Sequence, residues 1–102
     1  MMRFLGVLRG AGVVASGEQT LFRADYDFDG FLMNPGQIMC SGELRMPWEA
    51  LREVFGRRDL HLRTDDGRHL SLQFSEKTLR AESDAAHVNV GGDLPPASEW
   101  RH

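Results

Sequence analysis

Two histidines and an arginine fall close enough along the chain to form one polar surface. His61 and Arg63 alternate with apolar residues before Asp65-Asp66-Gly67, and His69 follows that turn. Imidazole and guanidinium groups bind anions, and imidazole also transfers protons near neutral pH. We therefore take His61, Arg63 and His69 as candidate ligand-binding residues. The competing interpretation is a solvated strand face without a function.

Three aspartates at alternate positions resemble the first half of a calcium-binding loop. Asp25, Asp27 and Asp29 precede Gly30, and such loops use alternate carboxylates followed by a glycine at a sharp turn. The second half does not match, because Gly36 stands where a bidentate glutamate is expected. We interpret the aspartates as a solvated strand face and expect no metal site. A calcium-responsive domain is kept as an alternative.

Other short motifs do not extend to a complete site. Gly10-Ala11-Gly12-Val13-Val14-Ala15 fits a relaxed dinucleotide-binding pattern, but too few residues follow it to form the helix that this site requires. The single cysteine, Cys40, is expected to point inward as a small apolar side chain. Ser41, Ser71 and Ser75 lack the glycines of a nucleophile elbow. We therefore assign no catalytic residue and expect no cofactor.

Two tryptophans stand at the ends of segments and are candidates for an interaction surface. Trp48 begins a predicted helix, and Trp100 lies in a proline-led stretch after Leu94. We expect one β-rich domain over residues 1–94 and a C-terminal tail over residues 95–102. Trp100 then either folds back onto the domain or meets a partner, since an exposed tryptophan is unusual.

Composition excludes several classes of protein. The 102 residues include 12 lysines and arginines and 15 aspartates and glutamates, a formal charge of −3. This length suits one domain with its own core, and one cysteine excludes an internal disulfide. No segment has the basic excess that is typical of nucleic-acid binding. Most arginines lie in residues 43–82, where an anionic partner is expected to bind if there is one.

Alternation of apolar and polar residues predicts the strands that position these side chains. Residues 3–9 form a short apolar run that we expect to end at Gly10-Ala11-Gly12, with Val13 and Val14 returning as its partner. Residues 20–28 alternate clearly, and a turn at Asn34-Pro35-Gly36 leads into a strand over residues 37–45. A last strand over residues 86–90 is expected to pair with the one before it.

The strongest local prediction is a hairpin after residue 60. Leu60 and Leu62 precede the turn, and Leu70 and Leu72 follow it. A two-residue turn would place apolar residues opposite polar ones, whereas a three-residue loop with Gly67 in a left-handed conformation pairs Leu62 with Leu70. The three-residue loop therefore predicts that Arg63 faces His69 and that His61 faces Ser71.

One helix is predicted over residues 47–55. Pro47 suits its first position and Gly56 suits the position after its end, while Trp48, Leu51, Val54 and Phe55 recur at helical spacing. Arg57 and Arg58 follow the last turn, where positive charge complements the helix dipole. The predicted fold class is mainly β, a β-rich α+β domain: a single antiparallel roll or sandwich of about six strands with this one short helix.

These observations favour a small, non-enzymatic, cytoplasmic binding or interaction module without a membrane segment. Its partner would be itself or another protein, bound through an open sheet edge or the surfaces of Trp48 and Trp100. The main alternative is a roll that binds a small anion or acts as an enzyme, with a concave interior lined by Tyr26, Trp48 and the His61, Arg63 and His69 group.

Overall fold

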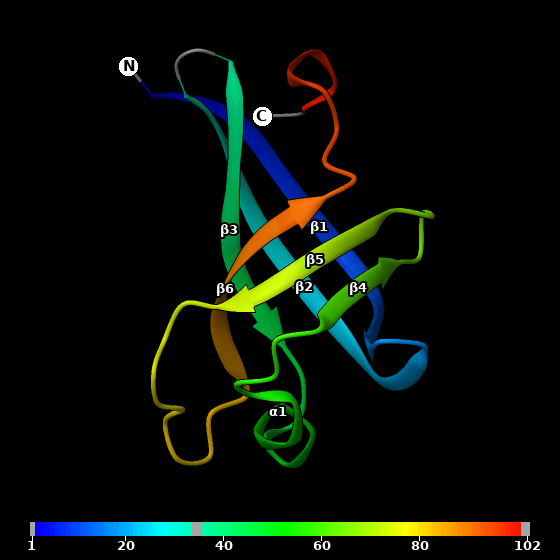
Figure 1. Ribbon diagram of the computed structural model, residues 1–102. Coiled ribbons are helices and arrows are strands. Elements are labelled where there is room, and N and C mark those ends of the chain that lie inside the picture. The colour runs from blue at the N-terminus through cyan, green and yellow to red at the C-terminus, as the bar shows by residue number, and fades with distance from the viewer. Residues whose placement is uncertain (1, 34–35, 101–102) are drawn as a thin grey trace.

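The alternating segments form strands that close into a barrel. The computed structural model describes residues 2–33 and 36–100, and these residues form six strands: β1 (Arg3–Ser16), β2 (Gln19–Met33), β3 (Gln37–Arg45), β4 (Leu60–Thr64), β5 (His69–Phe74) and β6 (Ala85–Gly92). All neighbours are antiparallel, and the order around the barrel is β1-β2-β3-β6-β5-β4, with β4 returning to β1 (Figure 1). The predicted mainly β class is confirmed.

The first strand differs from the prediction. Residues 3–16 form one continuous strand, with no return at the glycines, and its register against β2 shifts between Phe4 and Gly6 and between Val14 and Ala15. Gly12 lies where β1 begins to pair with β4, and a Cβ atom there would come within 2.4 Å of the Arg63 carbonyl oxygen. The glycine permits a close approach of two backbones, which explains why it does not mark a turn.

The hairpin has the predicted register. His61 pairs with Ser71, Leu62 with Leu70 and Arg63 with His69. The Thr64 amide donates to the Arg68 carbonyl at 2.9 Å, which leaves three residues in the loop. Before β3, the Gly36 amide donates to the Met33 carbonyl at 2.7 Å. The other residues of that predicted turn, Asn34 and Pro35, lie outside the described residues.

The helix and the C-terminal segment cover opposite ends of the barrel (Figure 1). Helix α1 (Trp48–Val54) buries Ala50, Leu51 and Val54 against the barrel core, with Pro47 at its N-cap. At the other end, a short 3₁₀ helix over Ala97–Glu99 leads to Trp100, which is buried. Pro95 is buried as well, so the packed structure continues beyond Leu94 through Trp100.

The interior of the barrel is filled by side chains from every strand. The inward residues alternate with outward polar ones, as the period of a half-buried strand requires. The largest side chains that are fully buried are those of Phe28, Leu44, Leu51, Leu62, Leu70, Val14, Val54, Val88 and Pro95. A filled interior leaves the outer face as the surface on which polar residues of β4, β5 and β6 can meet a ligand.

Candidate functional site

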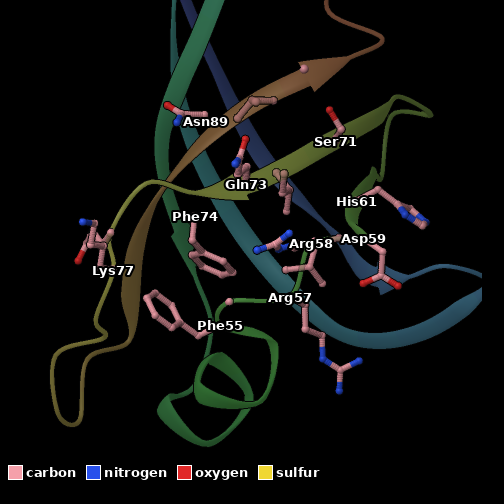
Figure 2. Close-up of a pocket in the computed structure, with 16 residues that line it drawn as sticks. Phe55, Arg57, Arg58, Asp59, His61, Ser71, Gln73, Phe74, Lys77 and Asn89 are labelled. Carbon is pink, nitrogen blue, oxygen red and sulfur yellow. The ribbon is translucent and has the colours of Figure 1, made fainter.

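A hollow lies on the outer face of the barrel, below β5 and beside the connection from α1 to β4. Its volume is about 1080 Å³. The connection after α1 forms one wall, the outward residues of β4, β5 and β6 form the back, and the segment after β5 closes the far side (Figure 2). This size lies slightly above the range of about 300–1,000 Å³ that is typical of small-molecule sites.

Cationic residues from two different segments line this hollow. Arg57 and Arg58 follow α1, and Lys77 follows β5. Figure 2 shows the Arg58 side chain lying across the hollow toward Gln73 and Phe74, whereas Arg57 extends away from it. Among the described residues, no carboxylate lies within 4.0 Å of the charged groups of these three side chains.

The two acidic residues that line the hollow have partners elsewhere. Hydrogen bonding from Ser16 lowers the pKa of Asp59, and the nearby positive charges of Arg57 and His61 lower it further. The Oε1 atom of Glu76 accepts a hydrogen bond from the His87 backbone amide at 3.1 Å. Ser16 and His87 are not among the residues that line the hollow, so each carboxylate has a hydrogen-bonding partner outside it.

Neutral polar side chains cover the back wall. Ser71 and Gln73 point outward from β5, and Asn89 points outward from β6 directly opposite Gln73 in the strand register. Amide side chains both donate and accept hydrogen bonds. Together with Arg58, they provide the few directional polar groups that orient a ligand in a site of this kind.

The predicted group of two histidines and an arginine is brought together only in part. The rings of His61 and His69 meet edge to face, with centroids 4.9 Å apart. Arg63 lies opposite His69 but donates to the Thr20 hydroxyl at 2.8 Å, on the side of β4 that faces away from β5. Of the three residues, His61 alone lines the hollow.

The alternative with a concave interior does not match the positions of its residues. Tyr26 is buried inside the barrel, where its ring stacks on Phe28 with centroids 5.1 Å apart. His61, Arg63 and His69 alternate with buried leucines and therefore lie on the outer face. The barrel wall separates Tyr26 from them, so the structure does not gather these residues around one interior.

The three alternate aspartates lie along the outer face of β2. Asp27 forms a salt bridge with Arg9 at 3.0 Å, and Asp25 lies opposite Arg45 on β3. Extended strand geometry separates alternate carboxylates instead of converging them on one point. Within the described part of the chain, no group of three or more histidine, cysteine or acidic side chains could hold a metal ion.

The two tryptophans have different surroundings. Trp48 is half-buried at the start of α1. Trp100 folds back onto the barrel, is 7% exposed and donates from Nε1 to the Pro95 carbonyl at 2.9 Å, so its ring does not lie on the outer surface. Closure of the barrel pairs part of the predicted open sheet edge, because residues 12–16 of β1 hydrogen-bond to β4.

Most residues of the hollow carry no motif that predicts a site. Arg57 and Arg58 were interpreted as complements to the helix dipole, and Lys77 carried no motif. Two signals were available in the sequence. One is the high arginine content of residues 43–82, and the other is the position of these cations directly after a predicted helix and a predicted strand. Another missed contact joins the Ser75 hydroxyl to His87 Nδ1 at 2.6 Å, outside the hollow.

Comparison of the chain with models of known protein families, with curated protein sequences and with solved structures finds no match. Among the described residues, no helix is long and apolar enough to cross a membrane. The fold defines the class as a six-stranded antiparallel barrel, and evidence about function comes from the geometry of the hollow.

Proposed function

We propose that this protein is a non-enzymatic binding module that holds a small anion in the hollow between α1 and the outer face of β5. The observation that carries the proposal is the position of Arg58, which lies across the hollow with no carboxylate within 4.0 Å among the described residues. A guanidinium group offers a planar set of donors that matches carboxylate and phosphate oxygens.

The surroundings of Arg58 support an anion over a cation as the ligand. The residues that line the hollow include three permanent cations and two carboxylates, which leaves an excess of positive charge: Arg57, Arg58 and Lys77 against Asp59 and Glu76. Charge-assisted hydrogen bonds are about twice as strong as neutral ones. An anion at the centre would therefore gain most from contact with Arg58.

We propose binding without catalysis because the serine that lines the hollow, Ser71, has no base hydrogen-bonded to it in the part of the chain that the structure describes. Ser71 faces His61 across β4 and β5, but no hydrogen bond joins their side chains among the described residues, and the serine that does bond an imidazole, Ser75 with His87, lies outside the hollow. Ser71 is therefore not paired with a base, which a serine nucleophile requires. The proposal retains the expected cytoplasmic location, with which a buried, unpaired Cys40 is consistent.

The test is a titration of isotope-labelled protein with inorganic phosphate, followed by amide chemical shifts. We expect saturable shifts in residues 57–61 and 71–77. Arg58→Gln should weaken binding by about tenfold or more, because a hydrogen bond to a charged group contributes about 1.5–3 kcal/mol. Arg3→Gln is the matched control, since it removes the same charge from an exposed position at the opposite end of the barrel.

Two results would contradict the proposal. The first is the absence of saturable shifts with both phosphate and simple carboxylates at millimolar concentration. The second is an equal loss of affinity in the Arg58 and Arg3 variants, which would show that only the net charge of the protein attracts anions.

A further inference from the structure

Two phenylalanines form an apolar wall beside Arg58. Phe55 follows α1 and Phe74 ends β5, and their ring centroids lie 4.8 Å apart with an angle of 50° between the ring planes. Both side chains are half-buried. Figure 2 shows the two rings on the same side of the hollow, with Phe74 nearer than Phe55 to the Arg58 side chain.

The size of the hollow exceeds what an inorganic anion needs. A water molecule occupies about 30 Å³ of liquid, and phosphate is only a few times larger. An anion of that size on Arg58 would leave the phenylalanine wall in contact with solvent in a hollow of about 1080 Å³. Covering such a wall is favourable by about 25 cal/mol for each Å² of apolar surface removed from water.

From this combination we infer that the ligand is an organic acid with an aromatic body, an aryl carboxylate. This inference rests on the proposed function and names its ligand class. The carboxylate contacts Arg58, the ring packs against Phe55 and Phe74, and further polar substituents reach Gln73 and Asn89 on the back wall. Charge complementarity to Arg58 selects the carboxylate, and the half-buried phenylalanine wall selects the ring.

The experiment compares ligands that differ in one part at a time. Benzoate carries both parts, acetate carries the carboxylate without the ring, and benzamide carries the ring without the charge. Binding is followed by amide shifts of residues 55–61 and 71–77. We expect benzoate to bind about tenfold more tightly than acetate, because removal of about 60 Å² of apolar surface contributes about 1.5 kcal/mol. We also expect it to bind about tenfold more tightly than benzamide, which lacks the charge that strengthens the hydrogen bonds to Arg58.

Matched variants separate the two contacts. Phe74→Leu and Phe55→Leu should each weaken benzoate binding by about threefold to tenfold and leave phosphate binding unchanged, since aromatic pairs contribute about 0.5–1.5 kcal/mol beyond buried area. Phe31→Leu is the control, because Phe31 is half-buried in an aromatic pair at the opposite end of the barrel. Arg58→Gln should weaken binding of both ligands.

The outcomes distinguish this inference from the function on which it rests. If acetate and phosphate bind as tightly as benzoate, the aryl ligand is wrong and the anion site stands. If benzamide binds as tightly as benzoate, the ligand class is wrong, and phosphate binding still tests the anion site. If no anion binds, both the ligand class and the anion site are wrong. A loss of benzoate affinity in Phe31→Leu equal to that in Phe74→Leu would also overturn the role of the wall.

Discussion

Cys40 illustrates how burial controls the chemistry of a single side chain. It lies on the inner face of β3, is 5% exposed and has no disulfide partner. Desolvation raises the pKa of its thiol from 9.0 to about 12, and the negative charge of Asp29 adds to this effect. Because the thiolate is the reactive form, a thiol that stays protonated in the folded protein is inert.

The raised pKa of Cys40 predicts a loss of stability in alkaline solution. Above the ordinary value of 9.0, the unfolded chain releases the thiol proton and the folded protein retains it, so the free energy of unfolding falls as pH rises toward about 12. Between about pH 8 and about pH 10 the expected loss is about 1 kcal/mol. Urea denaturation at both pH values measures it.

Cys40→Ala provides the control for this titration. It lowers the free energy of unfolding at both pH values but should remove most of the difference between them. Burial also raises the pKa of Tyr26 from 10.0, so measurements are kept at or below about pH 10. An unchanged pH dependence in the Cys40 variant would show that another group is responsible.

The hairpin of β4 and β5 shows how one element is determined by its turn. The Gly67 amide donates to the Thr64 carbonyl at 3.0 Å, and Gly67 has a φ of +95°. A left-handed residue at the third position of a three-residue loop sets the register of the strands that follow. This register places His61 and Ser71 on the outer face that forms part of the hollow.

Gly67→Ala is expected to lower the free energy of unfolding by about 1–2 kcal/mol, because a Cβ atom disfavours positive φ. Nothing lies within 4 Å of the position that this Cβ would take, so the cost is conformational rather than steric. Thermal or urea denaturation measures the change. Gly67→Asn should cost less, since asparagine tolerates left-handed conformations better. Equal costs for both variants would contradict this explanation.

At the scale of the whole molecule, the barrel depends on what covers its two ends. Helix α1 covers one end, and residues 95–100 cover the other (Figure 1). A Cβ atom at Gly30 would come within 2.5 Å of the Trp100 ring, so the glycine on β2 makes room for the indole. Trp100 therefore belongs to the core and completes the packing of the barrel.

This packing predicts a coupling between Gly30 and Trp100. Trp100→Ala should lower the free energy of unfolding by about 3–5 kcal/mol, as removal of a large buried side chain does. Gly30→Ala alone should cost about 1–3 kcal/mol through overpacking. Combined with Trp100→Ala, the Gly30 substitution should cost much less, because the ring that it meets is gone.

A double-mutant cycle measured by urea denaturation checks this coupling. If the costs of Gly30→Ala and Trp100→Ala simply add, the two residues do not interact as the structure indicates.

Some elements of this fold can be predicted from the sequence and others cannot, and the reasons are physical. The hairpin and α1 were predictable because their apolar periods and turn residues act within about ten positions. The continuity of β1 was not, since Gly10 and Gly12 are explained by Tyr26 and by the β4 backbone, both distant in sequence. The candidate site was predicted only through His61, because Phe55 and Arg58 after α1 meet Phe74 of β5, which is distant in sequence.

The amino-acid sequence by itself determined the β-rich class, the register of β4 and β5, the inward position of Cys40 and the helix after Pro47. Each follows from local periodicity and backbone preference. Only the tertiary structure decided that the sheet closes into a barrel, that Trp100 is buried and that Arg58 lies beside a phenylalanine wall. Those features arise from long-range packing, which depends on how separate faces fit together and is not encoded within any one segment.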